Sequence, residues 1–156
     1  MAAPVVGKRA PDFTAPSTSG ETFRLTDHRG RAVVLYFYPR DATPGCTQQG
    51  EAFRDLYPKF RRAGAEVYGI SRDTLESHGR FRGKHDFPFD LLSDADEKAC
   101  KLYDVIHEKT LYGRKSLGVV RSTFLIDAEG TLRREWRKVK VAGHAEEVLE
   151  AIRSLD

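Results

Sequence analysis

The apolar and polar positions along the chain describe short buried strands that alternate with amphipathic helices. Residues 32–38 (AVVLYFY) are β-branched or aromatic and lack polar alternation, which is typical of a strand buried on both faces. Residues 65–71 (AEVYGIS) also read as a buried strand. Between them a helix is expected to begin with Thr43 as its N-cap and Pro44 at the first helical position. Pro58 is expected to bend or interrupt that helix.

The remaining segments extend this pattern towards both ends of the chain. Two short extended pieces, at residues 13–15 and 22–25, flank the turn signal STSG and predict an N-terminal β-hairpin. Further elements are expected as a helix over 74–86, a strand over 89–92, a helix over 94–103, a loop rich in charge and glycine, a hairpin over 119–139 and a helix over 144–155. This order predicts an α/β fold with a central mixed β-sheet and helices on both faces. It resembles a thioredoxin-like fold.

Length and charge narrow the class of protein. With 156 residues, the chain is expected to form a single domain over 1–156. The 26 Lys and Arg against 23 acidic residues give a net charge of +3, which is too small to indicate nucleic acid binding. The basic tract RREWRKVKV reads first as a strand with one solvated face. No nucleic acid partner is therefore expected.

The start of the chain is not expected to act as a secretory signal. Pro and charged residues interrupt its first residues, MAAPVVGKRAPDF, unlike the apolar core of a secretory signal. No stretch approaches the roughly 18 apolar residues of a membrane helix. Two cysteines are too few for a disulfide framework in a chain of this length. We therefore expect a cytoplasmic protein without a membrane partner.

The segment YPRDATPGCTQQGE places Cys46 at the start of a helix, directly after a buried strand. Free backbone N–H groups and the positive end of the helix dipole favour an anion at this position. The thiolate of Cys46, the reactive form of a cysteine, should therefore be stabilised. The N–H groups of Cys46 and Gly45 are also placed to donate hydrogen bonds to a bound oxygen.

Pro39, Thr43 and Cys46 stand in the spacing P-x-x-x-T-x-x-C, and this loop resembles the active-site signature of the peroxiredoxin family. The resemblance implies that Pro39 shields the sulfur from water and that the Thr43 hydroxyl orients the peroxide. Taken singly, Pro39 could be only a strand terminator and Thr43 only a helix cap. Their joint spacing to Cys46 makes that coincidence less plausible.

Peroxide cleavage builds negative charge on the departing oxygen, so a nearby fixed cation should lower the barrier. The resemblance assigns this role to Arg121, in the segment VVRSTFLID. Nothing local in the sequence distinguishes Arg121 from the other arginines.

The resemblance covers nearly the whole chain and is closest to the Q-type subgroup, also called bacterioferritin comigratory protein. It is carried by the segments APDFTAP, VVLYFYPRDATPGCT, EVYGIS, LLSDADEKACKLYDV, YGRKSLGVVRSTFLID and EWRKVKVAGHAEEVLEAI, in this order. It implies a thiol-dependent peroxidase that reduces hydrogen peroxide and organic hydroperoxides. It further implies no cofactor, a thiol reductant such as thioredoxin, glutaredoxin or a small thiol, and a monomeric state.

The second cysteine of many subgroup members has no counterpart at its usual positions. Five residues after Cys46 stands Glu51, and the alternative position on the next helix falls in residues 81–83, FRG. The other cysteine of the chain is Cys100. Cys100 either forms a disulfide with the oxidised Cys46 or is a buried apolar filler, in which case an external thiol reduces Cys46. We prefer the external thiol.

Other classes of protein fit less well. A thioredoxin-like reductase needs a C-x-x-C motif, but Gln49 occupies the second cysteine's place. The five histidines lack ligand spacing, so no metal site is predicted, and most of them are expected at the surface: His28, His78, His85, His107 and His144. A redox sensor or chaperone-like protein that uses Cys46 without efficient turnover remains the alternative function.

Overall fold

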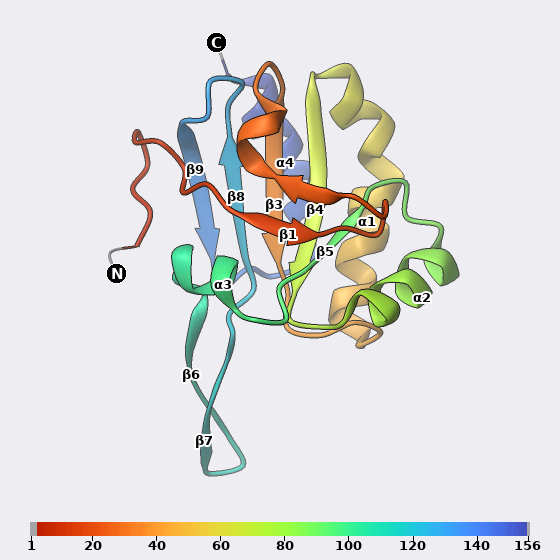
Figure 1. The fold of residues 1–156 in the computed structure, drawn as a ribbon, viewed down its shortest axis with the longest axis vertical. Helices are drawn as coiled ribbons and strands as arrows, with labels where there is room; N and C mark the ends of the chain where they lie inside the picture. Colours follow the sequence, from red (N-terminus) through yellow and green to blue (C-terminus); the bar gives the residue numbers. More distant parts are fainter. Residues whose placement is uncertain (1–2, 156) are drawn as a thin grey trace.

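The fold is organised around a sheet with the strand order β5-β4-β3-β8-β9. The computed structural model describes residues 3–155, and Figure 1 shows this sheet at the centre of the molecule. Its strands are β3 (Ala32–Phe37), β4 (Ala65–Ser71), β5 (Leu91–Ser93), β8 (Ser122–Ile126) and β9 (Leu132–Arg137). β3 pairs in parallel with β4 and antiparallel with β8. The sheet is therefore mixed, as the sequence predicts.

The central strand β3 is buried on both faces because each of its side chains enters one of two apolar cores. Val33, Leu35 and Phe37 belong to one core, and Val34 and Tyr36 belong to the other. Successive side chains of a strand point to opposite faces, so an all-apolar strand must be covered on both. The buried apolar run predicted from the sequence is thus the central strand of the sheet, covered by a core on each face.

Different elements cover the two faces of the sheet. One core is closed by α1 (Pro44–Arg62), α2 (Leu75–His85) and α4 (His144–Arg153). The other is closed by the hairpin β1 (Thr14–Pro16) and β2 (Thr22–Arg24), the short 3-10 helix η1 (Leu25–His28) and α3 (Lys98–Leu102). In Figure 1 the red hairpin crosses in front of the sheet, while α1 and α4 lie behind it. The predicted α/β architecture and N-terminal hairpin are confirmed.

Two local predictions are wrong in detail, and a third holds only in part. The expected loop after residue 103 contains a hairpin, β6 (Ile106–Leu111) with β7 (Arg114–Val119), which projects from the body of the fold (Figure 1). The predicted helix over 94–103 is reduced to α3. Pro58, expected to bend or interrupt α1, lies at an exposed position inside the helix and does not interrupt it.

Within residues 3–155, no helix combines the length and the apolar character that crossing a bilayer requires.

Close packing across the sheet gives a stability prediction at Gly69 in β4. A Cβ added there would lie 2.8 Å from the Tyr36 ring and 2.9 Å from Leu91. Gly69→Ala should therefore lower the free energy of unfolding by about 1–3 kcal/mol. Gly83 in α2 is exposed, and a Cβ added there would meet no atom within 4 Å. Gly83→Ala should therefore raise the free energy of unfolding by about 0.5–1 kcal/mol. Urea unfolding of both variants tests this, and an unchanged midpoint for Gly69→Ala would contradict it.

Candidate active site

Cys46 is the third residue of α1, one short loop after the end of β3. Thr43 occupies the N-cap and Pro44 the first helical position, as predicted. Because proline has no N–H, only Gly45 and Cys46 contribute free backbone donors before the helical hydrogen bonds begin at Thr47, whose N–H bonds to the Thr43 carbonyl. The Cys46 side chain lies in the core beneath α1 and is 2% exposed. Water therefore contributes little to solvating a charge on this sulfur.

The loop between β3 and α1 places Pro39 and Thr43 on either side of a turn. Both residues are half-buried. The Thr43 hydroxyl makes no capping hydrogen bond to the helix and instead donates to the Arg40 carbonyl at 2.9 Å. With its proton engaged there, the Thr43 oxygen is free to accept a hydrogen bond from a ligand O–H.

Arg121 reaches the sulfur because of the register between β3 and β8. Ser122 pairs with Phe37, so Arg121, the residue before β8, lies beside the end of β3. Its Nη2 donates to Cys46 Sγ at 3.4 Å. A guanidinium stays charged in proteins, so this contact stabilises negative charge on the sulfur. The structure thus brings together Cys46 and Arg121, which are 75 positions apart in the chain.

Gln49 is a member of this site that the sequence analysis missed. It is 1% exposed, and its Oε1 accepts a short hydrogen bond from Arg121 Nη1. The same guanidinium is therefore held by Gln49 and directed at Cys46, one helical turn earlier on α1. The i, i+3 spacing from Cys46 was the signal that could have revealed Gln49, since such residues share a helix face.

Cys100 lies away from Cys46, on the other side of the sheet. Cys46 belongs to the core under α1, and Cys100 belongs to the core under the N-terminal hairpin. Cys100 is fully buried, and both cysteines are free thiols. Burial raises the pKa of the Cys100 thiol far above its ordinary value, and the neighbouring Asp94 raises it further. The structure therefore does not bring the two sulfurs together.

Two of the five histidines depart from the surface position expected of most of them. His78 and His144 are buried, and the other three are half-buried. Each buried ring has a polar partner: His144 Nε2 lies 2.8 Å from Thr123 Oγ1, and His78 Nδ1 lies 2.7 Å from Asp41 Oδ2. Such partners come from distant parts of the chain, so the sequence offered no sign of them.

Comparison with known proteins places the chain in a family. The sequence model of the AhpC/TSA family matches residues 6–135. The chain belongs to the AhpC/TSA family. It is 49% identical to peroxiredoxin Bcp of Xanthomonas campestris pv. campestris over 143 residues, 92% of this chain and 89% of the relative. It is 45% identical to peroxiredoxin Bcp of Bacillus subtilis over 150 residues, 96% of each chain.

A solved structure agrees with this assignment. Xanthomonas campestris bacterioferritin comigratory protein, described for its alkyl peroxide reduction activity and its trapped intermediate/ligand complexes, superimposes with a TM-score of 0.90 at 45% identity. The match covers 96% of this chain and 98% of that one. The resemblance read from the sequence is confirmed: this AhpC/TSA protein is a peroxiredoxin of the Q-type subgroup and a thiol-dependent peroxidase.

The close approach of Arg121 to the helix backbone gives a prediction for this peroxiredoxin. A Cβ added at Gly45 would lie 3.2 Å from Arg121 Nη2, so the guanidinium must shift by a few tenths of an ångström. Gly45→Ala should therefore slow peroxide reduction by about threefold to tenfold without lowering stability. Stopped-flow rates and urea midpoints separate the two effects, with Gly83→Ala as control. A full rate in Gly45→Ala would mean that Arg121 needs no fixed position.

Proposed function

We propose that Cys46 is the attacking sulfur of this peroxidase and that Arg121, Thr43 and Pro39 form its immediate reaction site. The observation that carries the proposal is the contact at 3.4 Å between Arg121 Nη2 and Cys46 Sγ at the start of α1. A buried sulfur with a fixed cation and two free backbone donors is suited to hold a negative charge.

The thiolate of Cys46 attacks one oxygen of the hydroperoxide, and the O–O bond breaks as the S–O bond forms. Sulfur loses two electrons and becomes a sulfenic acid, while the departing oxygen leaves as hydroxide or alkoxide and takes up a proton. Arg121 and the N–H groups of Gly45 and Cys46 stabilise the charge that moves onto the oxygens. Thr43 accepts a hydrogen bond from the peroxide O–H and so orients it, while Pro39 limits the access of water.

The proposed substrates are hydrogen peroxide and organic hydroperoxides. The similarity to a bacterioferritin comigratory protein described for alkyl peroxide reduction supports the organic substrates. The groups assigned to the reaction all come from one chain, so we propose that a monomer is active. A role as a sensor without turnover is less well supported, since the relatives are named as peroxiredoxins.

An external thiol is proposed to restore the enzyme. The thiol attacks the sulfenic acid, forms a mixed disulfide and releases water, and a second thiol then frees Cys46. Burial of Cys100 in the opposite core supports this route over an internal disulfide. Thioredoxin, glutaredoxin or a small thiol would fit the role.

Substitution of the reacting groups tests the proposed function. Cys46→Ser should abolish the consumption of hydrogen peroxide, since its hydroxyl is not ionised at neutral pH. Arg121→Ala should slow it by about 10²–10³-fold, because a fixed charge near the sulfur is lost. Arg80→Ala, which removes an exposed arginine on α2, is the matched control and should keep the full rate. Wild-type turnover in Cys46→Ser would refute the assignment.

Intact-mass measurement after one equivalent of peroxide tests the route of reduction. The protein should gain one oxygen, as a sulfenic acid does, and keep one free thiol on Cys100. A loss of two hydrogens would instead indicate a disulfide between Cys46 and Cys100. Cys100→Ala is the control, and it should gain the same oxygen and retain turnover with an external thiol.

A further inference from the structure

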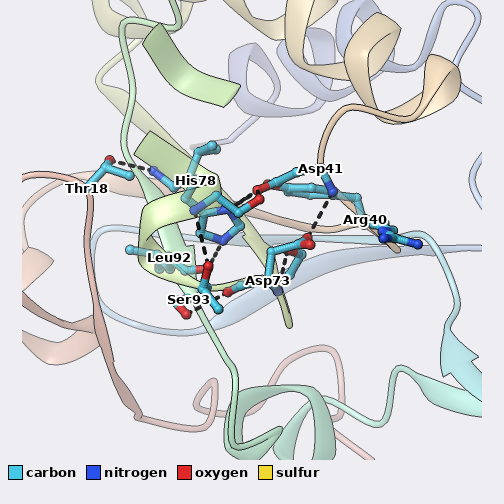
Figure 2. A network of polar contacts seen from close by, with 12 residues as sticks. Thr18, Arg40, Asp41, Asp73, His78, Leu92 and Ser93 are labelled. Carbon is cyan, nitrogen blue, oxygen red and sulfur yellow. Dashed lines mark hydrogen bonds and ion pairs between the residues drawn. The ribbon is translucent and has the colours of Figure 1, made fainter. Parts of the chain in front are cut away.

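A buried polar network lies behind the loop that leads to Cys46. Its centre is a contact between Asp41, in that loop, and His78, on α2 (Figure 2). The Asp41 side chain is 3% exposed and that of His78 is fully buried. His78 Nδ1 lies 2.7 Å from Asp41 Oδ2, and His78 Nε2 lies 2.9 Å from the carbonyl oxygen of Leu92. The imidazole therefore connects three separate segments: the loop, α2 and β5.

The partners of His78 determine how its protons are used. A carbonyl oxygen only accepts, so Nε2 must donate its proton to Leu92. One further proton then lies between Nδ1 and Asp41 Oδ2, whichever atom formally holds it. Tyr38 donates to Asp41 Oδ1 at 2.6 Å and Ser77 donates to Oδ2 at 2.8 Å. Burial alone would raise the pKa of Asp41, but the hydrogen bonds from His78, Tyr38 and Ser77 outweigh it and lower the pKa.

The backbone of the loop is held by the same network. The N–H of Asp41 donates to Asp73 Oδ2 at 2.9 Å, and Ser71 also donates to that oxygen. Asp41 is thus fixed through both its side chain and its main chain, and Figure 2 shows it beside Asp73, which precedes α2, and His78, on that helix. The next residue, Ala42, has a φ of 64°. A non-glycine residue keeps this left-handed conformation only where its surroundings hold it.

We propose that the Asp41–His78 pair is a positioning element for peroxide reduction, which holds the loop from Pro39 to Thr43 in the conformation that the reaction needs. Asp41 lies between these two residues in sequence, two positions from each. In the part of the chain that the structure describes, neither Asp41 nor His78 hydrogen-bonds to Cys46, Thr43 or Arg121. Their effect therefore passes through the backbone. This inference rests on the proposed role of Cys46 as the attacking sulfur.

The same residues are a poor cation site. Ligand atoms of Asp41, Asp73 and His78 lie within 4.8 Å of one another. Both ring nitrogens of His78 and both carboxylate oxygens of Asp41, however, already have hydrogen-bond partners within the protein. A metal ion would have to break these buried contacts. The closed network therefore favours a positioning role.

The test compares His78→Gln with His85→Gln, which makes the same change on the same helix at a half-buried residue outside the network. The second-order rate with hydrogen peroxide is measured beside the alkylation rate of Cys46 by iodoacetamide, at a temperature where thermal unfolding shows both variants to be folded. We expect His78→Gln to lower the peroxide rate by about tenfold and to lower alkylation much less, because alkylation does not use Thr43. His85→Gln should change neither rate.

A folded His78→Gln whose peroxide rate stays within about twofold of the wild type would overturn the inference. If His78→Gln does not fold, Ser77→Ala decides the matter, because it removes only one donor to Asp41. It should slow peroxide reduction about threefold, and an unchanged rate would reject the positioning role. Cys46→Ser in the same assay separates the two proposals. If Cys46→Ser stays active, the proposed function fails. If Cys46→Ser is inactive while His78→Gln and Ser77→Ala keep the full rate, only the positioning role is rejected.

Discussion

The architecture of the site depends on one contact, the guanidinium of Arg121 against the sulfur of Cys46. A thiolate placed in an apolar core has lost most of its hydration, and only fixed charges and dipoles can replace it. The contact forms because β8 lies antiparallel to β3, with Ser122 opposite Phe37. A shift of one residue in that register would turn Arg121 to the other face of the sheet and leave the sulfur without its cation.

The two-sided burial of β3 also separates the two cysteines of the chain. A sheet whose two faces carry separate cores keeps Cys46 and Cys100 apart without any further device. Joining them would require a large part of one core to open, because disulfide geometry brings the Cα atoms within about 7 Å. The same fold therefore keeps its two free thiols in separate cores.

Local signals were enough to predict the strand before Cys46 and the helix that begins at Pro44, because both depend on residues close in sequence. Arg121 and Gln49 are different, since their roles depend on strand register and on a shared helix face. Family resemblance supplied Arg121, but nothing in the sequence analysis supplied Gln49 or the buried His78. The β6–β7 hairpin was missed because most of β7 is exposed and polar, without the apolar alternation by which a strand is recognised.

The proline that opens α1 has a consequence for selectivity. A helix start normally offers three or four amide hydrogens and so attracts phosphate and sulfate, which are far more abundant in cells than peroxides. Pro44 reduces this supply to the amides of Gly45 and Cys46. Two donors suit a ligand of two bonded oxygens but leave a tetrahedral oxyanion with unmet acceptors. The first turn of α1 therefore offers a tetrahedral anion fewer backbone donors than an ordinary helix start does.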